Sequence, residues 1–189
     1  MGLQGQSSYH IRLATPADIP ALDRLIPASI RVLGAGFYTE RQIEAAVMHV
    51  FGVDTQLIED GTYYVAGADG EIVGCGGWSR RATLYGSDRA KGGSPDPLLD
   101  PGRDAARIRA FFVAPAWARR GIGSAIIRRC EAEAAAAGFR ALELVATLPG
   151  ERLYARHGYA AEERLEVEVP GVEPLPGVRM SKRVAGGAQ

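Results

Sequence analysis

The chain of 189 residues is 47% hydrophobic and 23% charged, a composition that fits one globular domain and excludes disordered and fibrous classes. Lysine plus arginine equals aspartate plus glutamate at 22 each, so the chain has no overall positive field for binding nucleic acid. Its apolar runs stop short of the roughly 20 residues that span a bilayer, so we expect a soluble, cytoplasmic protein with neither a membrane nor a nucleic-acid partner.

The first third of the chain predicts one strand followed by two helices. A short apolar run over 9–14 ends in Thr15-Pro16-Ala17-Asp18, whose hydroxyl, proline and acid are typical of the first turn of a helix. Apolar residues at helical spacing continue this helix over 19–33. A capping box formed by Thr39 and Gln42 begins the second helix.

The middle of the chain predicts a hairpin and a long connection. Strand-like runs over 63–66 and 72–78 are joined by a turn containing Asp69-Gly70. Residues 80–106 are rich in Gly, Pro, Asp and Arg and lack periodicity, which indicates a functional loop, a flexible insertion, or both. The arginines of this connection could recognise an acidic substrate group, although the aspartates between them could neutralise their charge.

The last part of the chain alternates strands and helices. Strands are predicted over 107–113, 142–146, 165–169 and 178–184, with helices over 121–137 and 148–157 between the first three. The complete order, β-α-α-β-β-β-α-β-α-β-β, predicts an α/β or α+β layered domain around a mixed sheet.

Both chain ends and both cysteines are expected to have no chemical role. Residues 1–8 carry no targeting signal and 185–189 follow the last predicted strand, so both are predicted to be flexible tails around a single domain over 9–184. Cys75 and Cys130 have no metal-type spacing, and we expect buried reduced thiols and no metal site.

A glycine-bearing turn before the helix at 121–137 is the main chemical feature. It reads Trp117-Ala118-Arg119-Arg120-Gly121-Ile122-Gly123-Ser124. The first amides of a helix lack partners, glycines let a phosphate approach them, and Arg119 and Arg120 add positive charge. A P-loop would need Gly-Lys-Ser or Gly-Lys-Thr, and a dinucleotide fold would need glycine at Ile126. The turn therefore predicts a different phosphate cradle, with an ordinary glycine turn beside two solvated arginines as the alternative.

The stretch from Phe111 to Ser124 resembles the pyrophosphate motif of the GCN5-related N-acetyltransferase (GNAT) family, including Val113 and Pro115 before the glycine turn. The family usually has Gln or Arg where this chain has Ala118, a departure that a cradle of backbone amides should tolerate. A second stretch, Leu153-Tyr154-Ala155-Arg156-His157-Gly158-Tyr159, is similar to the family's aromatic signature. Together with the opening strand and helix, the resemblance covers nearly the whole chain.

The resemblance implies a GNAT-like acyl-CoA N-acyltransferase fold, α/β (α+β layered), whose mixed, mostly antiparallel sheet is flanked by helices and opens between its fourth and fifth strands. It also implies acetyl-CoA as cosubstrate, without a metal. The amide of Val113 or its neighbour is expected to donate to the thioester oxygen. Thr147 stands where many members carry an asparagine, and it could also cap the next helix. The residues then expected to bind the cosubstrate are Phe111, Phe112, Val113, Arg119, Arg120, Gly121, Ile122, Gly123, Ser124 and Thr147.

The resemblance also implies that Tyr154 is the catalytic acid that protonates the departing thiolate, with core packing as the alternative interpretation. No glutamate stands at the start of the fourth strand, where family members often carry one. Glu143, Asp54 and Glu71 are weak candidates for the general base, and each also fits a surface or capping residue.

The expected activity is therefore transfer of an acetyl group from acetyl-CoA to a primary amine of a small molecule by direct attack. A protein amine as acceptor, a noncatalytic acyl-CoA-binding regulatory module and a nucleotide-phosphate binder are the alternatives. Glutamates between Glu162 and Glu168 could attract a cationic acceptor, although their alternation favours a solvated strand face. The sequence leaves open whether the protein forms a homodimer.

Overall fold

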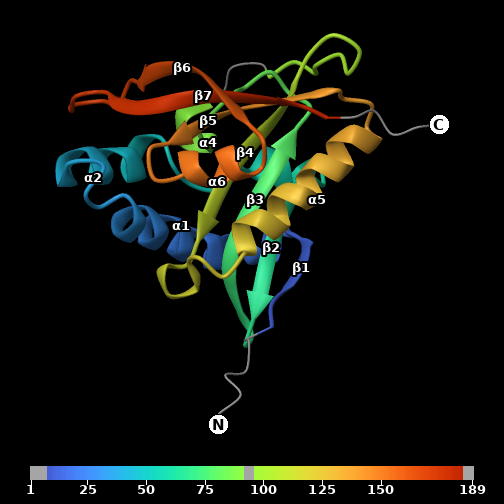
Figure 1. The fold of residues 1–189 in the computed structure, drawn as a ribbon. Coiled ribbons are helices and arrows are strands. Elements are labelled where there is room, and N and C mark those ends of the chain that lie inside the picture. Colours follow the sequence, from blue (N-terminus) through green and yellow to red (C-terminus); the bar gives the residue numbers. More distant parts are fainter. Residues whose placement is uncertain (1–7, 92–95, 185–189) are drawn as a thin grey trace.

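The computed structural model describes residues 8–91 and 96–184, which form a twisted sheet between helices (Figure 1). Most of the predicted N-terminal tail, 1–7, and the predicted C-terminal tail, 185–189, lie outside the described residues. The strands are β1 (His10–Leu13), β2 (Tyr63–Ala68), β3 (Glu71–Ser79), β4 (Ala106–Val113), β5 (Ala141–Thr147), β6 (Ala160–Val167) and β7 (Leu175–Arg183). The helices are η1 (Pro16–Asp18), α1 (Ile19–Leu33), α2 (Glu40–His49), α3 (Thr55–Glu59), α4 (Asp88–Lys91), η2 (Pro115–Trp117), α5 (Ile122–Ala136) and α6 (Glu151–Arg156).

The seven strands are ordered β1-β2-β3-β4-β5-β7-β6. Every neighbouring pair is antiparallel except β4 and β5, which are parallel. Their described pairing covers Ala106 with Leu142 and Arg107 with Glu143, at the start of both strands. The sheet therefore opens beyond this point, as expected between the fourth and fifth strands, and the fold class is confirmed.

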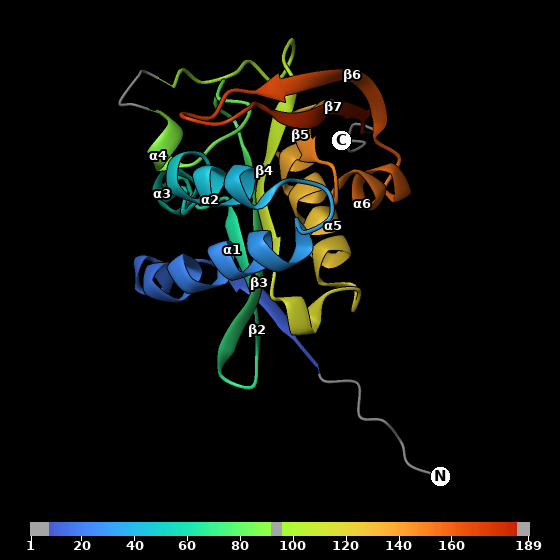
Figure 2. The same ribbon diagram turned by 90° about the vertical axis from the view of Figure 1, so that its left-hand side faces the viewer.

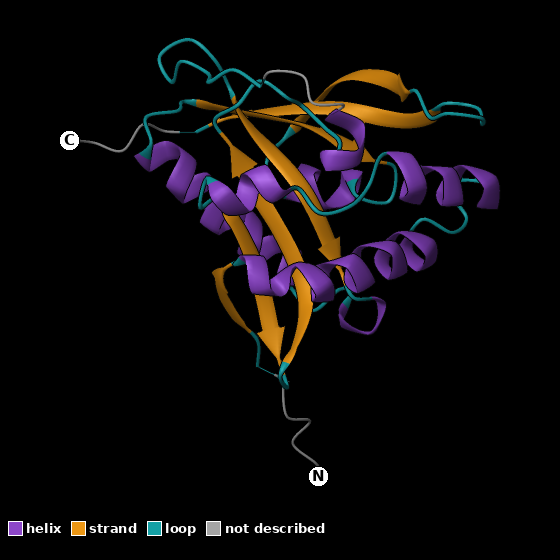
Figure 3. Ribbon diagram, turned by 180° about the vertical axis from the view of Figure 1, so that it is seen from behind, coloured by secondary structure: helices purple, strands orange, loops and turns teal. Residues whose placement is uncertain are grey.

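Helices cover both faces of the sheet, with α1 and α2 on one face and α5 on the other (Figures 1 to 3). Successive side chains of β2 point alternately into the hydrophobic layers on the two faces of the sheet. Tyr64 belongs to the hydrophobic cluster under α5, whereas Val65 belongs to the cluster under α1. Ile126 of α5 and Ile26 of α1 are both fully buried, each stabilising its layer by about 1.5–3 kcal/mol.

The local signals in the sequence correspond to the turns and caps of the structure. The side chain of Thr39 accepts from the amide of Gln42 at 3.2 Å, and Gln42 Oε1 accepts from the amide of Thr39 at 3.0 Å. Asp69 and Gly70 adopt φ values of 51° and 80°, as a two-residue hairpin turn of the primed type requires. Gly138 ends α5 with a φ of 94°.

Three parts of the predicted secondary structure were incomplete or wrong. Helix α3 was not predicted, because it is too short to show a repeating apolar face. Strand β6 begins at Ala160 rather than at 165, because its first half is exposed and polar and is held by pairing with β7. The connection over 80–106 contains α4 and a bridge between Arg81 and Leu98. None of the helices in the described ranges combines the length and apolarity of a membrane span.

Candidate active site

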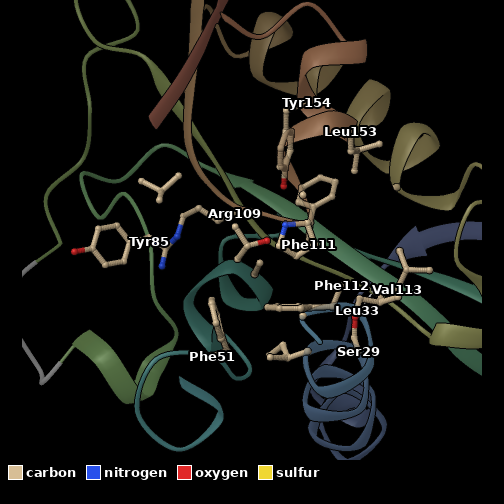
Figure 4. A pocket seen from close by; sticks show the side chains of 18 of the residues that line it. Ser29, Leu33, Phe51, Tyr85, Arg109, Phe111, Phe112, Val113, Leu153 and Tyr154 are labelled. Carbon is tan, nitrogen blue, oxygen red and sulfur yellow. Dashed lines mark hydrogen bonds between the residues drawn. The ribbon is translucent and has the colours of Figure 1, made fainter. Parts of the chain in front are cut away.

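A cavity of about 730 Å³ lies at the opening between β4 and β5 (Figure 4). Its walls come from segments far apart in the sequence: α1 and the turn after it, the segment 84–87, strand β4, the start of α5, the end of β5, and α6. Nine of the ten residues expected to bind acetyl-CoA line it, and Arg120 is the exception. Tyr154 lines the same cavity, so the structure brings the two sequence motifs together.

The glycine turn presents unpaired amides to this cavity. Arg119 and Gly121 adopt left-handed φ values of 66° and 85°, which turn the chain sharply from η2 into α5. The amide of Ala125 makes the first helical bond, to the carbonyl of Gly121 at 2.9 Å. The amides of Ile122, Gly123 and Ser124 therefore precede the first bonded turn, and the helix dipole adds positive potential where they lie. This is the geometry of an anion cradle.

Two glycines let the start of α5 approach the sheet and α6 closely. A Cβ at Gly74 of β3 would lie 2.6 Å from Ile122 Cγ2, and a Cβ at Gly123 would lie 2.9 Å from Leu153 Cδ2. Both distances are shorter than real contacts allow. The first turn of α5 therefore takes its place beside the cavity because these positions lack side chains.

The positive charge around the cradle differs from the sequence expectation. Arg119 lines the cavity, but the guanidinium of Arg120 lies 4.8 Å from the ring centroid of Trp117 and is not part of the lining. Arg152 and Arg156 of α6 contribute instead. Neither residue was given a role from the sequence, although their spacing of four places both on one face of the helix, a signal that could have indicated one.

Strand β4 forms the central wall and is distorted. Ala110 has a φ of 57°, and the register against β3 shifts between Cys75 and Gly77, which marks a bulge. The Tyr63 hydroxyl donates to the Ala110 carbonyl at 3.1 Å and holds this distortion. The amide of Val113, a candidate oxyanion donor, instead donates to Ser29 Oγ at a long 3.3 Å. Ser29, a buried residue of α1, carried no signal in the sequence.

Tyr154 is 8% exposed, and its hydroxyl points into the cavity beside Phe111 (Figure 4). Its ring makes edge contacts with Phe111 and Tyr159 at centroid distances of 6.0 and 5.8 Å. Burial raises the pKa of the Tyr154 hydroxyl well above its usual value, so the group keeps its proton at neutral pH. The ring of Tyr154 therefore packs against its aromatic neighbours while its hydroxyl is available to the cavity.

Thr147 and His157 lie at the two ends of the α6 segment. Thr147 ends β5 and lines the cavity, but α6 begins after Gly150, so the expected capping role of Thr147 is wrong. Its carbonyl accepts from the amide of Gly150 at 2.9 Å. His157 Nε2 is hydrogen bonded to Ser124 Oγ at 2.9 Å, which connects α6 to the cradle. Burial lowers the pKa of His157, so its ring is neutral at pH 7.

The carboxylates considered as bases are held elsewhere. Asp54 and Glu143 are buried, so neither is a surface residue, although Asp54 does occupy the N-cap position of α3, without a side-chain capping bond. Glu143 pairs with Arg107 and Arg179 at the point where β4 and β5 separate. Asp54 Oδ2 lies 2.7 Å from a terminal nitrogen of Arg109. Glu71 is exposed in the β2–β3 hairpin and does not line the cavity. Among the described residues, no group of three or more metal-ligating side chains is found.

The open sheet with a helix beginning at its split defines the acyl-CoA N-acyltransferase fold. Residues 34–159 match the family model described as acetyltransferase (GNAT) family, and the chain belongs to this family. It is therefore an acyltransferase by family.

Solved structures share this fold over most of the chain. A GCN5-related N-acetyltransferase from Rhodopseudomonas palustris is 25% identical with a TM-score of 0.70, and the match covers 97% of this chain and 100% of that chain. The PaiA N-acetyltransferase from Thermoplasma acidophilum, in complex with coenzyme A, is 15% identical with a TM-score of 0.62 over 94% and 99%. A GNAT family acetyltransferase from Brucella melitensis, in complex with acetyl-CoA, is 21% identical with a TM-score of 0.51 over 82% and 84%. None of the curated proteins matches the chain.

Proposed function

We propose that this protein transfers the acetyl group of acetyl-CoA directly to a primary amine of a small molecule. The observation that carries the proposal is one cavity that joins unpaired amides at the start of α5 to the buried hydroxyl of Tyr154. Membership of the GNAT family and the coenzyme complexes of the Thermoplasma and Brucella proteins support acetyl-CoA as the donor.

The residues present fit the proposed donor. The amides of Ile122, Gly123 and Ser124 would hold its diphosphate, with Arg119 and Arg152 supplying positive charge. The pantetheine arm would run along Phe111, Phe112 and Val113, with the Thr147 hydroxyl opposite. The donor supplies an acetyl thioester, whose carbonyl carbon accepts the amine. The amide of Val113 would exchange its long bond to Ser29 for the developing oxyanion.

Direct attack is favoured over an acyl-enzyme because neither cysteine can act as the nucleophile. Cys75 and Cys130 are buried, and neither is among the residues that line the cavity. Burial raises the pKa of the Cys75 thiol to about 12 and raises that of Cys130 well above its usual value, so both stay protonated. The amine nitrogen therefore bonds to the thioester carbon without an intermediate acyl-protein.

Tyr154 would complete the reaction as the acid. When the carbon–sulfur bond breaks, the thiolate takes the hydroxyl proton, and the proton that the amine loses restores the tyrosine. The raised pKa of Tyr154 keeps the hydroxyl protonated before transfer. The product pair is an N-acetyl amide and the free thiol of coenzyme A, so atoms and charge balance.

The substitution Tyr154→Phe tests the proposal against a noncatalytic acyl-CoA-binding module. It keeps the ring contacts with Phe111 and Tyr159, so the fold and the Kd for acetyl-CoA should not change. Thiol release from acetyl-CoA with a panel of amines should fall by about 10²–10⁴-fold in kcat. Tyr159→Phe is the matched control, because Tyr159 is a buried neighbour in the same aromatic stack that does not line the cavity.

Equal turnover in the wild-type protein and the Tyr154→Phe variant would refute the role of this hydroxyl. Absence of turnover with every amine, together with acetyl-CoA binding by calorimetry, would favour the binding module. Absence of acetyl-CoA binding would remove the proposal entirely, and a preference for ATP would favour the nucleotide binder.

A further inference from the structure

The far end of the cavity, on the side of Phe111 away from the cradle, is where the acceptor must enter. Figure 4 shows Tyr85 and Arg109 on one side of Phe111, and Val113 and Leu153 on the other. The second side belongs to the cradle, because a Cβ at Gly123 would touch Leu153. The first side is therefore the acceptor end.

The acceptor end is apolar. Its walls include Phe51 after α2 and Tyr85 from the connection before β4, with Leu84 next to Tyr85 in the lining. Tyr85 is 43% exposed and lines the cavity, so an apolar ligand at this end would remove its ring from water. The Phe51 ring contacts the Phe112 ring at a centroid distance of 5.9 Å, so the apolar surface continues to the reaction centre.

Segment 84–87 is fixed in place as a wall. The amide and the hydroxyl of Ser87 donate to the carbonyl of Val50 at 3.0 and 2.8 Å, and the amide of Asp88 donates to the carbonyl of Val53 at 3.3 Å. A terminal nitrogen of Arg109 donates to the carbonyl of Gly86 at 2.5 Å. These bonds give the connection a formed surface before any ligand binds, which lowers the entropic cost of binding.

The charges on the cavity wall are of one sign. Among the described residues that line it, the charged side chains are Arg109, Arg119, Arg152 and Arg156, and none is Asp, Glu, Lys or His. Three of these arginines belong to the cradle and α6. Arg109 is the charge at the acceptor end, its side chain is 2% exposed, and Asp54 lies against it at 2.7 Å. Because that carboxylate neutralises it, the acceptor end carries no net charge.

We propose that the acceptor is a primary amine whose remainder is apolar, uncharged and about the size of an aromatic ring, held by Phe51 and Tyr85. The inference rests on the proposed acetyl transfer. No carboxylate on the described lining can hold an ammonium, and an apolar wall raises the free energy of a charged amine. The wall thus binds the amine in its neutral, nucleophilic form, which compensates for the missing glutamate base at the start of β4.

A matched set of amines tests the proposal by thiol release from acetyl-CoA. 2-Phenylethylamine has the proposed chemistry, 1,4-diaminobutane replaces the ring end with a second cation, and L-phenylalanine adds a carboxylate beside the amine. We expect kcat/KM for 2-phenylethylamine to exceed that for the diamine by at least about 100-fold, since the second ammonium would leave water without a partner. In a series of n-alkylamines, each added methylene should raise kcat/KM about fourfold until the apolar end is filled.

The substitution Tyr85→Asp tests which surface sets the preference. It places a carboxylate at the acceptor end, so kcat/KM for 2-phenylethylamine should fall about tenfold while that for the diamine rises. Val32→Asp is the matched control, because Val32 is 57% exposed at the end of α1 but does not line the cavity. Both positions are exposed, so both variants should fold and keep the wild-type Kd for acetyl-CoA.

Three results would overturn the inference: a preference for the diamine or a lysine peptide, a preference for L-phenylalanine over 2-phenylethylamine, or an unchanged ratio in the Tyr85→Asp variant. The first two results would leave acetyl transfer intact and change only the acceptor class. The second would indicate that Arg109 binds the carboxylate of the acceptor. If none of the amines causes thiol release while acetyl-CoA still binds, the proposed function and this inference are overturned together.

Discussion

The buried ion pair between Asp54 and Arg109 allows the sharpest test of how this fold supports its cavity. The two side chains are 0% and 2% exposed and lie 2.7 Å apart. At an effective dielectric constant of about 20, their Coulomb attraction is about 6 kcal/mol, most of which offsets the cost of removing both charges from water. Removing one partner leaves the other charge buried, so Asp54→Asn and Arg109→Met should each reduce the free energy of unfolding by about 3–5 kcal/mol.

A double-mutant cycle measured by urea denaturation separates this pair from simple loss of packing. The double variant should be at least about 2 kcal/mol more stable than the sum of the two single losses predicts, because it removes both buried charges. The single variants should melt about 6–20 °C lower than the wild-type protein. Arg31 and Glu44 form the control pair, at 2.6 Å with both side chains 49% exposed, and because water screens this pair its removal should lower stability far less than loss of the buried pair. Single losses below about 1 kcal/mol at Asp54 and Arg109, or additive losses in the cycle, would refute the reasoning.

Three further predictions follow from the cradle, the N-terminal cap and the thiols. Gly121→Ala should cost about 1–2 kcal/mol in unfolding free energy, because Gly121 has a φ of 85°, and calorimetry should show weaker acetyl-CoA binding; an unchanged Kd would contradict the cradle. The ion pair with Arg12 lowers the pKa of Asp18 from 3.8 to about 2, so its stabilisation is present above pH 3.8 and is lost as the pH falls through about 2. After discounting for the 43% exposure of Arg12, the loss should be about 1 kcal/mol, measurable as a difference between wild type and Asp18→Asn in denaturation midpoints at pH 6 and below pH 3. Cys75 and Cys130 should not react with a thiol reagent in the native protein and should both react in urea, and fast native labelling of either would contradict their burial.

The sequence by itself determined the elements that have strong local causes. The capping box of Thr39 and Gln42, the Asp69-Gly70 hairpin turn and Gly138 at the end of α5 act through neighbouring atoms, and the structure confirms each of them. The turn around Gly121 was identified in the same way, because unpaired amides at a helix start depend on local geometry alone. The family was also identifiable, since two ordered motifs carried it.

The tertiary structure alone decided which distant residues share the cavity. Ser29 accepts from the amide of Val113, Arg152 lines the cavity whereas Arg120 does not, and Tyr85 lines the same cavity. Helix packing and the opening of the sheet bring together these segments, which are far apart in sequence. The burial of Asp54 could not be predicted from the sequence, since a carboxylate at the start of a short helix usually faces water. Local chemistry thus determined the glycine turn that we propose as the phosphate cradle, whereas the charge and shape of the proposed acceptor end depend on long-range packing.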